Sequence, residues 1–143
     1  MKEITFSPKQ EKKIVQAIRE AELNTSGEIR VHISRESSDN HFESAMKVFD
    51  QLGMSATKQR NGVLFHVGLK DRNFTIIGDA GIDQCAADDF WENIKNEVVS
   101  KFKKEKYVKG LVKGIQMTGI ALKKHFPYQE DDQNELPNEI SWD

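Results

Sequence analysis

The sequence has only one cysteine, Cys85, among its 143 residues, so no intramolecular disulfide can form. A chain without disulfides depends on a hydrophobic core, and 143 residues are enough to build one. Long apolar runs are also missing: no apolar segment follows Met1, and none approaches the ~20 residues that a membrane-spanning helix needs. These absences exclude a disulfide scaffold and a transmembrane helix, and they predict a single-domain cytoplasmic protein.

The chain also has little excess charge of either sign, with 21 Lys and Arg against 23 Asp and Glu. The distribution is uneven, because six acidic and no basic residues lie from Pro127 onward, which leaves 17 acidic residues in residues 1–126. The small, scattered positive charge of the body argues against nucleic-acid binding. The basic run 101–113 is typical of a solvated helix face. We expect one domain over residues 1–126, followed by a flexible acidic tail over residues 127–143.

Apolar residues recur at helical and at strand spacing in successive segments. Ser7 and Gln10 form a capping box that begins the first helix, and Pro8 suits its first position. The segment Glu28–Ser34 alternates apolar and polar residues, which predicts a strand buried on one face. This pattern predicts an α/β fold, an αβα sandwich in which helices flank a small mixed β-sheet. The predicted order is helix, strand, helix, strand, strand, helix and helix, over residues 8–23, 28–34, 42–52, 63–67, 74–77, 90–102 and 108–122.

The helix between the first two predicted strands implies a crossover connection, as in units that join parallel strands. If these strands are parallel, the loop 53–61 enters the second strand at the end of the sheet where the first strand begins. The third strand returns along a hairpin and leaves at this same end, into residues 78–89. We therefore expect the loops 53–61 and 78–89 to lie side by side, provided that the first two strands are parallel.

The segment from Asn73 to Ile94 holds five carboxylates and neither lysine nor arginine. Carboxylates gathered in one place repel one another unless a cation, solvent or protonation relieves the repulsion. Ligand sets made only of oxygen select hard cations, chiefly Ca²⁺ and Mg²⁺. The segment predicts a divalent-cation site for which Ca²⁺ is the first choice and Mg²⁺ the second. Its candidate ligands are Asp79, Asp83, Asp88 and Asp89.

A helix start explains part of the same segment without a cation. Asp83 is placed to cap the following helix, and Asp88 and Asp89 lie in early turns where acidic residues favour the helix dipole. The segment is not an EF-hand, because Gln84 stands in place of the glycine and Phe90 in place of the bidentate glutamate. From spacing alone, both the cation site and the capped helix start remain open.

The order of these features resembles the TPM domain family. The carrying motifs are Asn61–Leu64 before an apolar strand, Asp71–Arg72 at the hairpin turn, and the glycine turn Gly78–Gly81. Upstream, "TSGEIRVHIS" is similar to the family's first strand, and the pattern of Phe102, Tyr107, Gly110, Gly114 and Ile115 resembles its closing helices. The resemblance covers roughly residues 8–125, and the chain is identified as a stand-alone TPM domain.

The resemblance implies an αβα sandwich with divalent cations at the acidic loop end, near Asp79 and Asp83. The family's namesakes are a thylakoid lumen acid phosphatase, a photosystem II repair protein and a receptor auxiliary protein, and phosphatase activity is proposed for some members. This sequence differs from the usual pattern by placing Asp79 inside the glycine turn, which favours metal binding. It also lacks the signal peptide and membrane segment of many members, which favours a cytoplasmic location.

Three functions are therefore expected. The first is a Ca²⁺-binding module in which the metal orders the loops 53–61 and 78–89, as in a metal-responsive regulatory domain. The second is a metal-dependent acid phosphatase acting on phosphate monoesters, for which Arg60 is the best candidate to hold the phosphate. The third is a protein-interaction module in which the acidic tail or the basic helices bind an unidentified protein partner.

Overall fold

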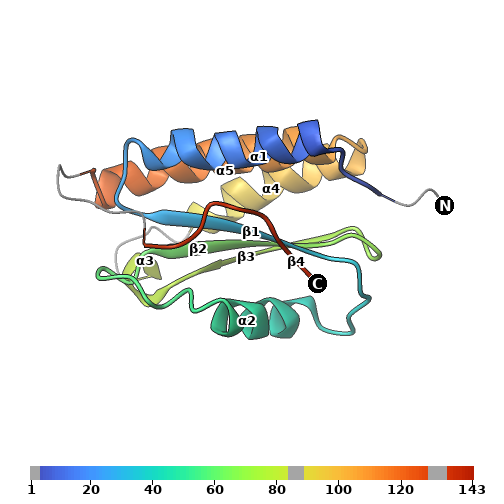
Figure 1. The fold of residues 1–143 in the computed structure, drawn as a ribbon, viewed down its shortest axis with the longest axis horizontal. Coiled ribbons are helices and arrows are strands. Elements are labelled where there is room, and N and C mark those ends of the chain that lie inside the picture. Colours follow the sequence, from blue (N-terminus) through green and yellow to red (C-terminus); the bar gives the residue numbers. More distant parts are fainter. Residues whose placement is uncertain (1–3, 84–88, 129–134) are drawn as a thin grey trace.

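The structure is a computed structural model that describes residues 4–83, 89–128 and 135–143. Its four-stranded sheet has the strand order β3-β2-β1-β4. Helices α1, α4 and α5 cover one face of the sheet and α2 lies on the other, which confirms the predicted αβα sandwich (Figure 1). The elements are α1 (Pro8–Glu22), β1 (Glu28–Ser34), α2 (His41–Gln51), β2 (Gly62–Gly68), β3 (Asn73–Gly78), α3 (Ala80–Asp83), α4 (Phe90–Lys103), α5 (Tyr107–His125) and β4 (Ser141–Trp142).

The strand pairing decides which loops meet. β1 and β2 run parallel, with Glu28 opposite Gly62, and β3 runs antiparallel to β2. The start of β1, the start of β2 and the end of β3 therefore lie at one end of the sheet, here called the loop end. The parallel pairing of β1 and β2, on which the predicted contact between the loops depends, is confirmed.

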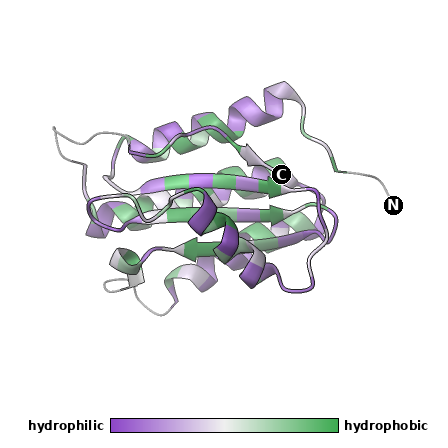
Figure 2. Cartoon of the chain, turned by 60° about the horizontal axis from the view of Figure 1, so that its bottom comes forward, coloured by the Kyte–Doolittle hydropathy of each residue, from purple (hydrophilic) through white to green (hydrophobic). Residues whose placement is uncertain are grey.

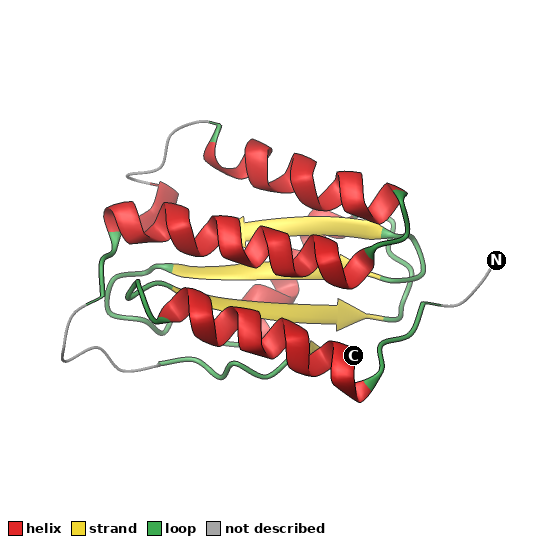
Figure 3. Ribbon diagram, turned by 90° about the horizontal axis from the view of Figure 1, so that it is seen from above, coloured by secondary structure: helices red, strands yellow, loops and turns green. Residues whose placement is uncertain are grey.

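The helical layer packs closely on the apolar face of the sheet. Seen from above, α1, α4 and α5 lie side by side over the sheet and run roughly along its strands (Figure 3). α5 lies between the other two helices, and two of its glycines allow the approach. A Cβ on Gly114 would lie 2.5 Å from Cγ2 of Val98 in α4, and one on Gly119 would lie 2.7 Å from Cβ of Ala21 in α1. Larger residues at these two positions would push the helices apart.

The opposite face of the sheet is buried as well, so the prediction of a half-buried first strand is wrong. All seven residues of β1 are buried, including the polar residues of its second face. Hydrophilic and hydrophobic residues alternate along the strands (Figure 2). The polar face of β1 is covered because residues 135–143 run beside it, with Leu136 buried against the sheet and β4 paired parallel to β1.

The domain boundary predicted near Pro127 stays a prediction. Among the described residues beyond it, 135–143 lie against the sheet, whereas the sequence pattern favoured a tail separate from the domain. No helix among the described residues combines the length and the apolar character that a membrane span requires.

Candidate functional site

The loops 53–61 and 78–83 are in direct contact at the loop end. The backbone N–H of Asp79 donates to the carbonyl of Gly62 at 2.9 Å, and the N–H of Gly81 donates to the carbonyl of Arg60 at 2.8 Å. The backbones are so close that a Cβ on Gly81 would lie 2.1 Å from the carbonyl oxygen of Gln59. The prediction that these loops lie side by side is confirmed as far as residue 83.

Asp79 is the centre of this junction. Its carboxylate side chain is only 5% exposed, so water solvates little of its charge. Oδ2 accepts from Nε of Arg60 at 2.8 Å, and Oδ1 accepts from Nη2 of the same guanidinium at 2.9 Å. Oδ1 also accepts from the backbone N–H of Ala80 at 2.8 Å, at the start of α3. Such a bidentate, charge-assisted pair satisfies both oxygens of a carboxylate that could not remain buried alone.

Arg60 joins the two loops from the solvent side. Its side chain is 52% exposed, and its backbone has a φ of 51°, a conformation that few residues other than glycine adopt. The hydrogen bonds and the charge of Asp79 raise the pKa of Arg60. Nη2 also donates to Oγ of Ser55 at 3.3 Å, so the guanidinium lies between a buried carboxylate and a hydroxyl of the 53–61 loop.

The other predicted ligands are not brought together by the described structure. Asp83 is the last residue of α3, but its side chain, like the whole of Asp88, lies outside the described residues. Asp89 is exposed at the position before α4 and makes no side-chain cap hydrogen bond. Within the part of the chain that the structure describes, no three His, Cys, Asp or Glu side chains form a group that could hold a metal ion.

The capping alternative needs a correction. It placed Asp83 at the start of the helix that follows, but Asp83 lies within α3, and the residue at the N-cap position of α4 is Asp89. The short helix α3 had no apolar period of its own in the sequence.

Comparison with known proteins identifies the fold family. The family model described as the TPM domain matches residues 2–120. The chain belongs to the TPM domain family. This TPM domain is also 47% identical to the BA42 protein of the psychrophilic bacterium Bizionia argentinensis, whose structure was determined by NMR. The match covers 100% of this chain and 99% of BA42, with a TM-score of 0.93.

Two more distant NMR structures share the fold of this TPM domain. The N-terminal domain of a protein from P. gingivalis has 19% identity and a TM-score of 0.68, and the match covers 91% of this chain and 82% of that one. The N-terminal domain of the cg2496 protein from Corynebacterium glutamicum has 11% identity and a TM-score of 0.67, with 92% and 82% covered. None of the curated proteins compared with the chain matches it.

Two further carboxylates of this TPM domain lie near the loop end, and neither is predicted by the local pattern of residues. Glu22 ends α1 and accepts from the backbone N–H of Ile29 at 2.9 Å, and burial raises its pKa to about 8. Glu28 begins β1 and accepts from the N–H of Leu136 at 2.7 Å, and burial raises its pKa to about 7. In sequence they look like the polar end of a helix and the solvent face of a strand. Only the packing around them reveals their burial.

Proposed function

We propose that this TPM domain is a divalent-cation-binding module whose site lies at the loop end and contains Asp79. The observation that carries the proposal is the pairing of this buried carboxylate with an exposed arginine. A carboxylate that is 5% exposed needs a positive charge beside it, and Arg60 supplies that charge from the surface. The guanidinium lies between oxygens of Asp79 and Ser55, and in this proposal it occupies the position that the cation would take.

The donor atoms fit a hard cation. The described side chains around the guanidinium offer carboxylate and hydroxyl oxygen, the ligand type that Ca²⁺ and Mg²⁺ prefer. Asp83, Asp88 and Asp89 follow Asp79 closely in sequence and remain the further candidate ligands. Ca²⁺ is the first choice, because it tolerates an irregular set of oxygen ligands better than Mg²⁺ does.

The expected consequence of binding is an ordered loop end. A cation held by both loops would replace the Arg60 bridge and release the arginine into solvent. The domain would then respond to cation concentration by changing the surface that residues 53–61 and 78–89 present. This is the behaviour of a metal-responsive regulatory module.

Titration with Ca²⁺ tests this proposal. In two-dimensional NMR spectra of the wild type, we expect the amide signals of residues 53–61 and 78–92 to shift together. Calorimetry should show binding that Asp79→Asn abolishes and Arg60→Met strengthens about tenfold, which corresponds to about 1.4 kcal/mol for loss of the competing charge. Asp39→Asn changes an exposed acid at the opposite end of the sheet and should bind as the wild type does. Equal weak heats from the wild type and Asp79→Asn would refute the site.

A metal-dependent phosphatase is the second candidate, and the exposure of Arg60 favours it. While Arg60 is paired with Asp79, its guanidinium is committed and cannot hold a phosphate fully. A cation bound at Asp79 would free this guanidinium beside the metal, and the two positive charges could bind a phosphate monoester. We expect hydrolysis of an aryl phosphate to require Ca²⁺ or Mg²⁺ and to fall at least tenfold in Arg60→Lys. Activity that a chelator leaves unchanged would contradict this mechanism.

A further inference from the structure

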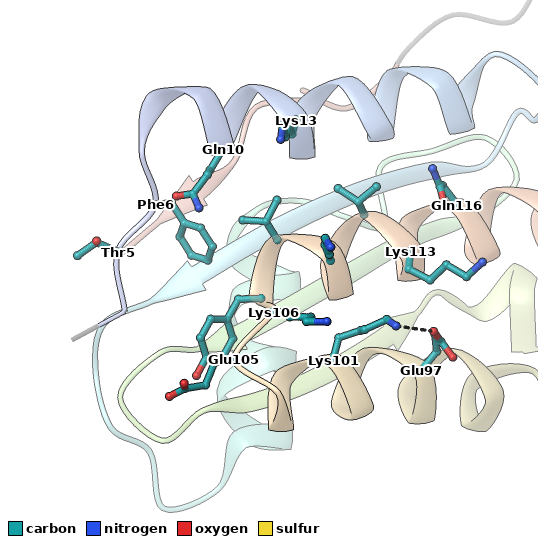
Figure 4. A pocket seen from close by; sticks show the side chains of 14 residues that line it. Thr5, Phe6, Gln10, Lys13, Glu97, Lys101, Glu105, Lys106, Lys113 and Gln116 are labelled. Carbon is teal, nitrogen blue, oxygen red and sulfur yellow. Dashed lines mark ion pairs between the residues drawn. The ribbon is translucent and has the colours of Figure 1, made fainter. Parts of the chain in front are cut away.

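The outer surface of the helical layer contains a groove that the cation proposal does not use. One part is a cavity of about 770 Å³ between the N-terminal segment, α1, α4 and α5 (Figure 4). A second hollow of about 780 Å³ runs along α1 and shares Lys13, Val112 and Gln116 with the first. The shared residues make the two hollows neighbours, and together they are here called the α1/α5 groove.

The floor of the α1/α5 groove is apolar. The residues lining it include Phe6, Val108 and Val112, which are partly buried and pack against the main core. None of the large, strongly exposed hydrophobic side chains in the described part of the chain lines the groove; these are Leu23, Phe42, Met46, Ile120 and Tyr128. The apolar surface is therefore recessed, and a ligand must enter the groove to reach it.

The rim of the α1/α5 groove is basic. Four acidic residues line it, Glu11, Glu20, Glu97 and Glu105, against eight basic ones: Lys9, Lys12, Lys13, Arg19, Lys101, Lys106, Lys109 and Lys113. Within the described residues, Lys101 alone among these eight has an ion-pair partner, Glu97 at 3.9 Å. The glutamates therefore offset only half of this positive charge, and the excess attracts an acidic ligand.

One end of the groove adds a further attraction for negative charge. α5 is 19 residues long and begins at Tyr107, in the lining of the groove, without a side-chain cap on its first N–H groups. A long helix carries partial positive charge at this end. The uncapped start of α5 therefore suits a carboxylate that reaches this end of the groove.

We propose that the α1/α5 groove is a docking site for an acidic amphipathic helix of a protein partner. The apolar face of such a helix would lie on Val108 and Val112, and its carboxylates would meet the lysines of the rim, as in other helix-in-groove complexes. The chain's own acidic C-terminal segment is not the occupant, because its described residues 135–143 lie beside β1. A flat anionic membrane fits less well, because the apolar residues are recessed below the basic rim.

The test uses a synthetic 18-residue helical peptide with leucines at helical spacing and glutamates elsewhere, labelled for fluorescence anisotropy. The wild type should bind it, and the triple variant Lys106→Glu, Lys109→Glu, Lys113→Glu should bind at least tenfold more weakly. A control triple variant, Lys47→Glu, Lys70→Glu, Lys124→Glu, makes the same charge change at exposed lysines outside the groove and should keep wild-type affinity. Circular dichroism would establish that each variant is folded.

Three outcomes would overturn the proposal. The first is a peptide affinity that both triple variants lower equally, since that would indicate only general charge attraction. The second is no detectable binding by the wild type at low salt. The third is binding to phosphatidylserine vesicles but not to the peptide, lost in the groove variant, which would assign the basic rim to a membrane surface. Calcium is absent throughout, so the result is independent of the cation site.

Discussion

Asp79 and Arg60 form a pair in which one partner is buried and the other exposed. Removing the solvation of a carboxylate costs several kcal/mol, which a nearby positive charge must offset. The 53–61 loop provides that charge from a residue whose side chain remains 52% exposed. If a cation binds at Asp79 as proposed, the side chain of Arg60 can return to water, because it is already half exposed. Such a cation must bind strongly enough to displace a bidentate guanidinium.

Gly81 is the residue that allows the two loops to touch. Alanine at this position would place its Cβ 2.1 Å from the carbonyl oxygen of Gln59 and 2.6 Å from that of Arg60. Backbone atoms cannot rotate away as a side chain can, so the loops must separate. We expect Gly81→Ala to lower the free energy of unfolding by about 2–3 kcal/mol, measured by urea denaturation.

Gly53→Ala is the matched control. Gly53 has a φ of 65° but no atom within 4 Å of an added Cβ, so only backbone strain of about 1 kcal/mol is expected. If Gly81→Ala and Gly53→Ala lowered the free energy of unfolding equally, the close contact between the loops would not be the reason that residue 81 must be glycine.

At the scale of elements, β1 shows how a polar strand face becomes buried. Glu28, Arg30, His32 and Ser34 alternate with the apolar residues that face α1 and α5, and all four are buried. The covering residues come from the far end of the chain. Nδ1 of His32 lies 2.9 Å from Oγ of Ser141, and its Nε2 lies 3.1 Å from a carboxylate oxygen of Asp143. The polar face of β1 therefore contacts polar side chains of residues 135–143, and Leu136 is the residue of this segment that packs in the core.

Leu136 tests whether the C-terminal segment stabilises the domain. It is 6% exposed and packs in the smaller core cluster with Met54 and Leu64. We expect Leu136→Ala to reduce the free energy of unfolding by about 2–3 kcal/mol, because the truncation leaves a cavity. Ile120→Ala removes a side chain that is 67% exposed and should change stability by less than about 0.5 kcal/mol. A Leu136 variant as stable as the wild type would mean that the segment contributes little to the fold.

At the scale of the whole molecule, buried titratable groups give the stability a pH dependence. Burial raises the pKa of Glu22 to about 8 and that of Glu28 to about 7, so folding is increasingly opposed as pH rises from about 4.5 to 8. Burial, and next the charge of His32, lower the pKa of His66 to about 4. The stability that depends on neutral His66 is present above about pH 6.5 and is lost as pH falls toward 4.

Between pH 4.5 and 6.5 the two carboxyl groups outweigh the one imidazole, so these three groups place maximum stability between about pH 4 and 4.5. Glu22→Gln should raise the free energy of unfolding at pH 8 by a few kcal/mol, at about 1.4 kcal/mol for each unit of pKa shift, and flatten the alkaline side of the profile. His66→Leu should flatten the acidic side. Urea denaturation from pH 3 to pH 9 measures both, with Glu20→Gln as the control on the exposed side of α1. A Glu22→Gln profile parallel to that of the wild type would contradict a raised pKa in the folded state.

Local sequence determined the elements of this TPM domain. The capping box of Ser7 and Gln10 begins α1 as predicted, and the apolar periods of the long helices and of the first three strands correspond to those in the structure. The acidic segment after β3 and its glycine turn were visible in the same way. These features depend on residues a few positions apart, whose spacing alone decides which face is apolar.

Contacts between distant segments were decided only by the tertiary structure. Arg60 as the partner of Asp79, the short α3, the burial of Glu22 and the pairing of β4 with β1 have no signal in local spacing. A charged residue in sequence looks exposed wherever it lies, because its burial depends on which other segment packs over it. The sequence showed that acidic residues gather after β3. Only the tertiary structure shows that Asp79 is buried and that the charge of Arg60 neutralises it.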